Sequence, residues 1–175
     1  MHLEIAAARN DDATVDQLAG LLVETVASGG SVSFMHPLDP DIARGFWSDT
    51  LAAADAGGRI VLTARAAGGL VGTVTLLLAM PQNQPHRAEI AKLMTSLAAR
   101  GRGVARALVR EAERRAASCG RTLITLDTAA EEGAGGFYER LGYERAGAIP
   151  GYAQKPHGGL CATLIYFKRL APAAV

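Results

Sequence analysis

A cluster of arginines interleaved with glycines near the middle of the chain is the first pattern that suggests chemistry. Its eleven residues include Arg100, Gly101, Arg102, Gly103, Arg106 and Arg110. Glycines let the backbone turn sharply, and N–H groups exposed at the start of a helix attract anions. Arginines beside them add charge-assisted hydrogen bonds to phosphate oxygens. The spacing fits neither a P-loop nor a dinucleotide fingerprint, so the cluster predicts a phosphate-binding turn of another kind or, alternatively, a structural turn with solvated arginines.

Cysteine and histidine give no sign of metal or redox chemistry. Cys119 and Cys161 match no metal-binding or redox spacing and are interpreted as reduced thiols. The four histidines are scattered along the chain. The sequence therefore predicts no metal site.

Composition favours a globular protein. The chain has 175 residues, of which 49% are hydrophobic and 20% charged, which is unlike a disordered, collagen-like or disulfide-rich chain. Its net charge of +1 does not favour a non-specific binder of nucleic acid or of a membrane. The N-terminus does not resemble a signal peptide, and the apolar run at residues 70–80 is shorter than the roughly 18 residues of a membrane span. We expect one domain at residues 1–170, a short tail at 171–175 and a cytoplasmic location.

Apolar periodicity and capping residues predict the elements that would position the cluster. They are a strand at 3–7, helices at 12–28 and 40–56, strands at 59–66, 70–78 and 87–95, a helix at 103–118, a strand at 122–126, a short helix at 134–141, and strands at 144–149 and 160–169. The second helix is traced through Ile42, Phe46 and Leu51, with Phe46 expected in the core. The order β-α-α-β-β-β-α-β-α-β-β predicts an α/β fold with a mixed sheet.

The cluster and its flanking segments resemble a known family. Arg100-x-x-Gly103-x-Ala105, with residues 88–94 before it and 137–143 after it, is similar to the acyl-CoA-binding core of the GNAT N-acetyltransferases. The resemblance covers nearly the whole chain. It extends to the branch typified by the tabtoxin resistance protein, which inactivates a toxin, through residues 31–35, 92–94, 126–128, 150–152 and 165–168.

The resemblance implies a GNAT-like, mainly antiparallel mixed sheet flanked by helices, with acetyl-CoA as cosubstrate and no metal. It places the pantetheine and acetyl-carbonyl contacts on Leu93, Met94 and Thr95. It places the pyrophosphate contacts on Arg100, Gly101, Arg102, Gly103, Val104, Ala105 and Arg106. One position departs from the family pattern, because Glu131 stands where asparagine is common.

Acetyl transfer from sulfur to nitrogen needs a neutral amine, a polarised carbonyl and a protonated leaving thiolate. Tyr138, which also contacts the cofactor in the resemblance, is the candidate acid, because a phenol with a pKa of about 10 stays protonated at neutral pH; alternatively it only packs its helix. Glu89 and Asp127 are both candidate bases, directly or through water, and each could instead be structural. The backbone N–H of Met94 would polarise the carbonyl.

The acceptor site is expected in segments that vary within the family. Phe34, Met35, Trp47 and Tyr152 would form an apolar wall, with Gln82 and Asn83 as hydrogen-bonding groups. The leading hypothesis is an N-acetyltransferase, monomeric or homodimeric, acting on a small-molecule amine such as a toxin, an antibiotic or an amino-acid-like metabolite. The alternatives are an enzyme that acetylates protein N-termini or lysines, and a non-catalytic CoA-sensing module.

Overall fold

The computed structural model describes residues 2–67, 69–130 and 134–171. Its elements are β1 (Glu4–Ala7), α1 (Asp12–Ala27), α2 (Pro40–Asp55), β2 (Arg59–Ala66), β3 (Gly69–Leu77), β4 (Arg87–Thr95), a short 3₁₀ turn (Leu97–Ala99), α3 (Val104–Ser118), β5 (Leu123–Ala129), α4 (Ala134–Arg140), β6 (Glu144–Gln154) and β7 (Leu160–Arg169). The predicted order of strands and helices is confirmed. Two predicted helix starts are confirmed as well, since the carboxylates of Asp11 and Asp39 accept hydrogen bonds from the amides of Thr14 and Asp41, both at 2.8 Å.

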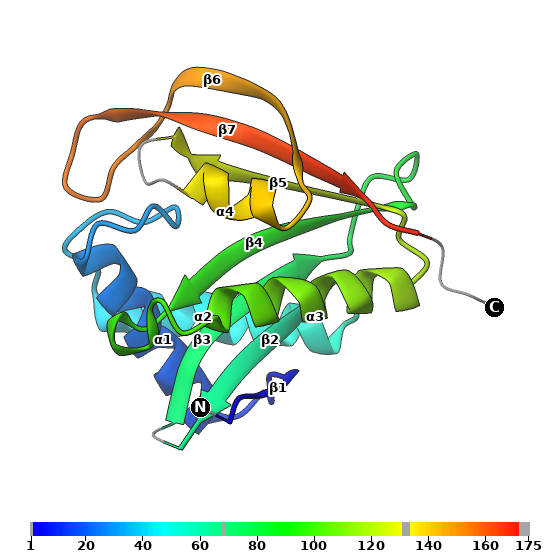
Figure 1. Ribbon diagram of the computed structural model, residues 1–175. Helices are drawn as coiled ribbons and strands as arrows, with labels where there is room; N and C mark the ends of the chain where they lie inside the picture. The colour runs from blue at the N-terminus through cyan, green and yellow to red at the C-terminus, as the bar shows by residue number, and fades with distance from the viewer. Residues whose placement is uncertain (1, 68, 131–133, 172–175) are drawn as a thin grey trace.

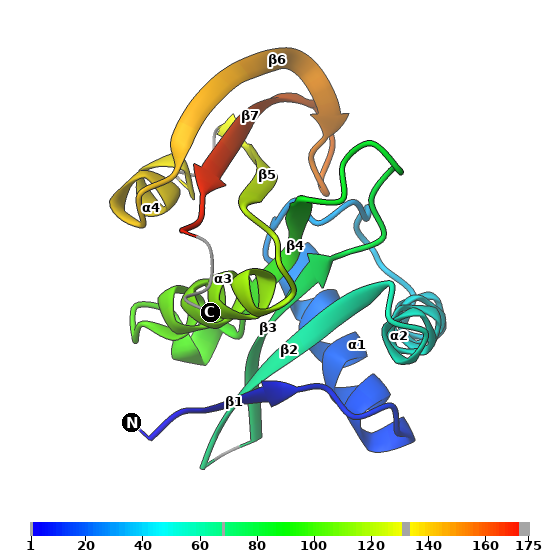
Figure 2. The ribbon, with the colours of Figure 1, turned by 90° about the vertical axis from the view of Figure 1, so that its right-hand side faces the viewer.

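One mixed sheet joins all the strands in the order β1-β2-β3-β4-β5-β7-β6. Every neighbouring pair is antiparallel except β4 and β5, which run parallel. Helices α1 and α2 cover one face of the sheet and α3 the other, with α4 on the same side as α3 (Figures 1 and 2). This confirms the predicted mainly antiparallel sheet flanked by helices.

The core forms on both faces of this sheet. On one face, α3 and α4 pack against the strands through residues such as Leu108, Val109 and Tyr138. On the other, α1 and α2 pack through Leu18, Leu22 and Trp47 against Val61 and Met94. Strand β4 therefore contributes side chains to both core clusters and is fixed from both sides. Among the described residues, no helix has the length and apolar composition that crossing a membrane requires.

Strand β6 is longer than the sequence predicted. The expected end at residue 149 rested on Pro150 and Gly151, but pairing with β7 resumes at Ala153 after an irregular stretch. Proline is tolerated on an edge strand, and Gly151 adopts a φ of +60° that suits a bulge. The extension brings residues 152–154 to the cavity described below.

Candidate active site

A cavity of about 360 Å³ opens where β4 and β5 separate. Their pairing is confined to residues 87–89 of β4 and 123–125 of β5, and beyond it the strands diverge (Figure 1). The described residues lining the cavity are 30–33 from the α1–α2 segment, 90–95 from β4, 127–129 from β5, Phe137 and Tyr138 from α4, 152–154 and 161–163 from β6 and β7, and Thr25, Arg100 and Ala105. The cavity is therefore lined by the two strands of the split, β4 and β5, and by the segments next to them.

A bulge in β4 shapes one wall of the cavity. Thr73 of β3 pairs with Met94 and Thr75 pairs with Ala91, so β4 holds one more residue than β3 between these pairs. Lys92, within the bulge, has a φ of +52°. A bulge interrupts the ladder and redirects the strand. The predicted cofactor contacts Leu93, Met94 and Thr95 follow directly and all line the cavity.

The arginine-glycine turn lies between β4 and α3. Gly101 and Gly103 have φ values of +73° and +81°, so both adopt the left-handed conformation that favours glycine. The Ala107 amide is the first in α3 to donate within the helix, to the Gly103 carbonyl, which leaves the amides of Val104, Ala105 and Arg106 at the N-terminus of α3 for an anion. The Val104 side chain is buried, so its contribution is limited to its amide.

The arginines of this turn differ in their surroundings. Arg100, Arg102 and Arg106 are all exposed, but Arg100 also donates to Ser28 Oγ at 3.3 Å and borders the cavity. The Arg102 amide donates to the Ala99 carbonyl at 3.4 Å. The side chain of Arg102, rather than its amide, is therefore the group that can bind a phosphate. Backbone amides at a helix N-terminus and guanidinium groups beside them are donors that suit phosphate oxygens.

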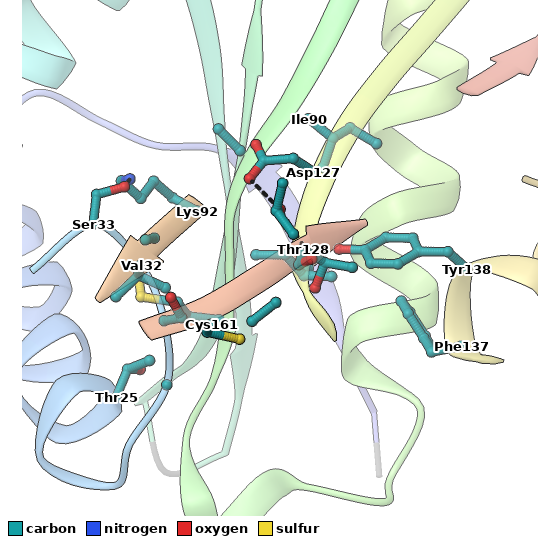
Figure 3. A pocket seen from close by; sticks show the side chains of 18 of the residues that line it. Thr25, Val32, Ser33, Ile90, Lys92, Asp127, Thr128, Phe137, Tyr138 and Cys161 are labelled. Atoms are coloured by element: carbon teal, nitrogen blue, oxygen red, sulfur yellow. Dashed lines mark hydrogen bonds between the residues drawn. The ribbon is translucent and has the colours of Figure 1, made fainter. Parts of the chain in front are cut away.

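Tyr138 closes the cavity from α4. Its side chain is 6% exposed and packs against Phe137, Tyr143 and Tyr166 at ring-centroid distances of 5.0, 5.7 and 6.0 Å. In Figure 3 its hydroxyl end points toward the strand that carries Thr128. Burial, reinforced by the negative charge of Asp127, raises the pKa of the Tyr138 phenol well above its usual range. The phenol therefore remains a proton donor at neutral pH.

Asp127 lies at the point where β5 leaves β4. Thr163 Oγ1, from the neighbouring strand β7, lies 3.2 Å from Asp127 Oδ2 and 3.1 Å from the Thr128 carbonyl. Asp127 is exposed to the cavity, and its charge acts on both Tyr138 and Lys92. A carboxylate held by one hydroxyl and open to solvent on its other side can accept a proton directly or through water.

Comparison with known proteins identifies the family of the chain. The model of the acetyltransferase (GNAT) family matches residues 30–143. The chain belongs to the GNAT acetyltransferase family. The match includes most of the α1–α2 segment, the β4 bulge, the arginine-glycine turn, Asp127 and Tyr138, whereas the cavity residues of β6 and β7 lie beyond it.

Solved structures of acetyltransferases share the fold over nearly the full chain. A phosphinothricin acetyltransferase of the GNAT superfamily from Sinorhizobium meliloti, solved in complex with AcCoA, has a TM-score of 0.83 at 18% identity, covering 100% of this chain and 92% of that one. A ribosomal-protein-alanine N-acetyltransferase from Brucella melitensis has a TM-score of 0.80 at 22% identity, covering 95% and 99%. A GCN5-related N-acetyltransferase from Kribbella flavida has a TM-score of 0.78 at 24% identity, covering 96% and 98%.

Glu89, the other candidate base, lies outside the residues that line the GNAT cavity. Its Oε2 forms an ion pair with Arg87 Nη1 at 3.0 Å, and the same nitrogen donates to Thr125 Oγ1 at 2.8 Å. The Arg87 side chain therefore holds Glu89 within β4 and joins β4 to β5 at the closed end of the split, where the two strands still pair.

The predicted acceptor residues separate into two groups. Tyr152 lines the cavity. Phe34 is half-buried and packs edge-on against Phe46 at 5.2 Å, next to the cavity wall formed by residues 30–33. Met35 is exposed beside this wall but does not line the cavity.

The structure places three of the predicted acceptor residues away from the cavity. Trp47 is 0% exposed and belongs to the core between α1 and α2, so no acceptor can reach it. Gln82 and Asn83 are exposed in the loop that precedes β4, at the end of the strand opposite the bulge (Figure 1). That loop is held by Arg121, whose guanidinium donates to the Pro85 carbonyl, and neither polar residue lines the cavity.

Two cavity residues, Lys92 and Ser33, received no role from sequence reasoning. Lys92 Nζ donates to Ser33 Oγ at 2.9 Å, and the two side chains lie beside each other across the cavity from Tyr138 (Figure 3). The sequence pointed to Lys92 and Ser33 only through segments that resemble a branch of the family.

Glu131, the position that departs from the family pattern, lies outside the described residues. Among the described residues, no cluster of three or more side chains could hold a metal ion.

Proposed function

We propose that this GNAT protein transfers the acetyl group of acetyl-CoA to the amine of a small molecule. The observation that supports this most strongly is a single cavity with two chemically distinct ends. We assign the α3 N-terminus and Arg100 to one end and Asp127 and Tyr138 to the other; Arg100, Ala105, Asp127 and Tyr138 all line the cavity. A nucleotide cosubstrate at the first end would present its thioester to the second.

Each residue of the cavity has a distinct part in the proposed transfer. Acetyl-CoA supplies the thioester, whose carbonyl carbon the acceptor amine attacks. The Met94 amide, beyond the β4 bulge, would donate to the carbonyl oxygen as negative charge develops there. Asp127 would take the proton of the amine, directly or through water, and the Tyr138 hydroxyl would give its proton to the departing sulfur. The Arg102 and Arg106 side chains would bind the phosphates.

The connections around the acceptor end support a small substrate. The His36 amide donates to the Pro156 carbonyl at 2.9 Å, and His157 Nε2 lies 3.1 Å from the Ala27 carbonyl. The two imidazole rings are 4.5 Å apart. These contacts tie the α1–α2 segment to the β6–β7 hairpin across the acceptor end, which restricts the path of a polypeptide.

A toxin, an antibiotic or an amino-acid-like metabolite is the acceptor we favour. The similarity of five short segments to the tabtoxin resistance branch supports this choice, as does the likeness in fold to a phosphinothricin acetyltransferase. The likeness to a ribosomal-protein-alanine N-acetyltransferase keeps a protein N-terminus as the second candidate.

Binding and transfer are tested separately. Millimolar acetyl-CoA should raise the melting temperature of the protein, because a ligand that binds only the folded state stabilises it. A panel of small amines is then screened for CoA thiol release. Stabilisation without release would favour a CoA-sensing module, release only with peptides would favour a protein acceptor, and no stabilisation would contradict the proposed cosubstrate.

Replacing Arg102 by glutamate tests the phosphate end. A negative charge beside the pyrophosphate should weaken acetyl-CoA binding by about tenfold or more, since a charged hydrogen bond is lost and a repulsion is added. Calorimetric titration measures the affinity. Arg9→Glu is the matched control. Arg9 precedes the N-terminus of α1, whereas the cavity is reached by the C-terminal end of that helix. Equal affinities of the two variants would argue against the phosphate site.

A further inference from the structure

Two residues with unusual backbone conformations meet at the wall of the cavity. Among the described residues, Ser33 and Lys92 are the non-glycine residues with positive φ, at +73° and +52°. They are 59 positions apart in the sequence, yet Lys92 Nζ donates to Ser33 Oγ at 2.9 Å. Such conformations cost free energy and persist where the surrounding structure enforces them, which is often at a functional site.

The Lys92 ammonium group is removed from bulk water without a matching negative charge. Its Nζ lies 6.0 Å from the ring centre of Phe34 and 5.8 Å from that of Phe46, distances at which an aromatic ring attracts a cation. Among the described residues, no carboxylate lies within ion-pairing distance of Nζ. Desolvation lowers the pKa of Lys92, and the charge of Asp127 across the cavity offsets part of this effect. A bound anion would stabilise this ammonium group.

We propose that Lys92 and Ser33 form the subsite that binds a carboxylate group of the acceptor, so that the enzyme selects amines that also carry an acid group. The inference rests on the proposed function and deepens it. Lys92 uses one of its three N–H donors on Ser33 and has two left. Ser33 accepts that hydrogen bond through its oxygen, which leaves its own O–H free to donate. The pair thus offers donors to both oxygens of one carboxylate.

The charged groups around the cavity suit an amino acid whose carboxylate lies at Lys92 and whose amine lies near Asp127, which is the orientation that acetyl transfer needs. Asp127 lies between Lys92 and Tyr138 in Figure 3, and its charge acts on both. A carboxylate at Lys92 would direct the amine of the same molecule toward Asp127 and the acetyl donor. A single ammonium and a hydroxyl suit one carboxylate better than a phosphate, which proteins commonly bind with arginines or a helix N-terminus.

The test compares amino acids with their carboxamides, which keep the amine and lose the negative charge. Binding of L-amino acids and of the matching carboxamides to the CoA-bound protein is measured by saturation-transfer NMR, for the wild type and for Lys92→Met. In the wild type we expect the best amino acid to bind about tenfold or more tightly than its carboxamide. In Lys92→Met this ratio should fall to near one, while the affinity for CoA stays unchanged.

Ser33→Ala is the second variant, and it keeps the lysine charge while removing one donor. It should lower the ratio partially, and melting temperatures of both variants establish that they fold. The proposal is overturned if no amino acid binds preferentially to the wild type, or if folded Lys92→Met and Ser33→Ala keep the wild-type ratio. If carboxylate binding depends on Lys92 but acetyl-CoA gives no acetylated product, the subsite stands and the proposed transferase function fails.

Discussion

At the scale of single residues, the Tyr138 hydroxyl is the group that we propose donates a proton to the departing sulfur. Tyr138→Phe should lower kcat strongly, because the departing thiolate loses its proton donor, while acetyl-CoA affinity stays within a few-fold. Thiol release at saturating substrates measures kcat, and calorimetry measures the affinity. Tyr143→Phe removes a hydroxyl from the same aromatic cluster outside the cavity and should leave kcat unchanged. An unaltered kcat in Tyr138→Phe would remove tyrosine from the acid role.

The two carboxylates make a second pair of matched variants. Asp127→Asn should lower kcat by about 10²–10⁴-fold, the usual contribution of general acid–base catalysis, while the new amide can still accept from Thr163. Glu89→Gln should have a smaller effect, because Glu89 pairs with Arg87 away from the cavity. Parallel kcat measurements decide between them. A larger loss in Glu89→Gln than in Asp127→Asn would reverse the assignment.

Some single residues were predictable from sequence and others were not. The sequence predicted Asp127 at the end of a strand and Tyr138 in a short helix, and both residues line the cavity. Lys92 was hidden, since its orientation depends on a bulge and on a partner 59 positions away. Trp47 was misassigned because α2 was traced through Ile42 and Phe46. The buried stripe is Ala43, Trp47, Thr50 and Leu51, so its first two members lie one position later than Ile42 and Phe46.

At the scale of elements, Gly72 lets β3, β4 and α3 approach each other at the bulge. A Cβ added at Gly72 would lie 2.9 Å from the Met94 carbonyl oxygen and 2.9 Å from Val104 Cγ1. Gly72→Ala should therefore lower the free energy of unfolding by about 1–3 kcal/mol and weaken acetyl-CoA binding, since we propose that the amides of Met94 and Val104 contact acetyl-CoA. Thermal denaturation and calorimetry measure the two effects.

Gly45→Ala is the control for that substitution. Gly45 lies within α2, where an added Cβ meets no atom within 4 Å. Alanine there should raise stability by about 0.5–1 kcal/mol because it favours the helix. Equal responses at Gly45 and Gly72 would contradict the packing described at the bulge.

Helices and strands were predictable from periodicity and capping, whereas their irregularities were not. The caps at Asp11 and Asp39 are local, so the sequence reveals them directly. The β4 bulge and the continuation of β6 past Pro150 arise from pairing with distant strands, and no local pattern encodes that register. The two features that were missed both shape the cavity.

At the scale of the whole molecule, the sheet brings distant segments to one reaction site. We propose that residues 1–170 work as one domain, because the cavity is lined by residues from Thr25 to Thr163 and its strands β4 to β7 belong to the same sheet as β1 to β3. The net charge of +1 conceals this arrangement. Positive charge gathers at the turn before α3 and at Lys92, the two places where we expect anionic groups to bind.

Transfer of an isotopically labelled acetyl group tests the central claim most directly. The protein is incubated with labelled acetyl-CoA and a mixture of small amines, and the products are identified by mass spectrometry. We predict that the label appears on the nitrogen of a small amine with the wild type and far more slowly with Tyr138→Phe. Label remaining on CoA or in its hydrolysis product acetate, with every amine unmodified, would contradict the account.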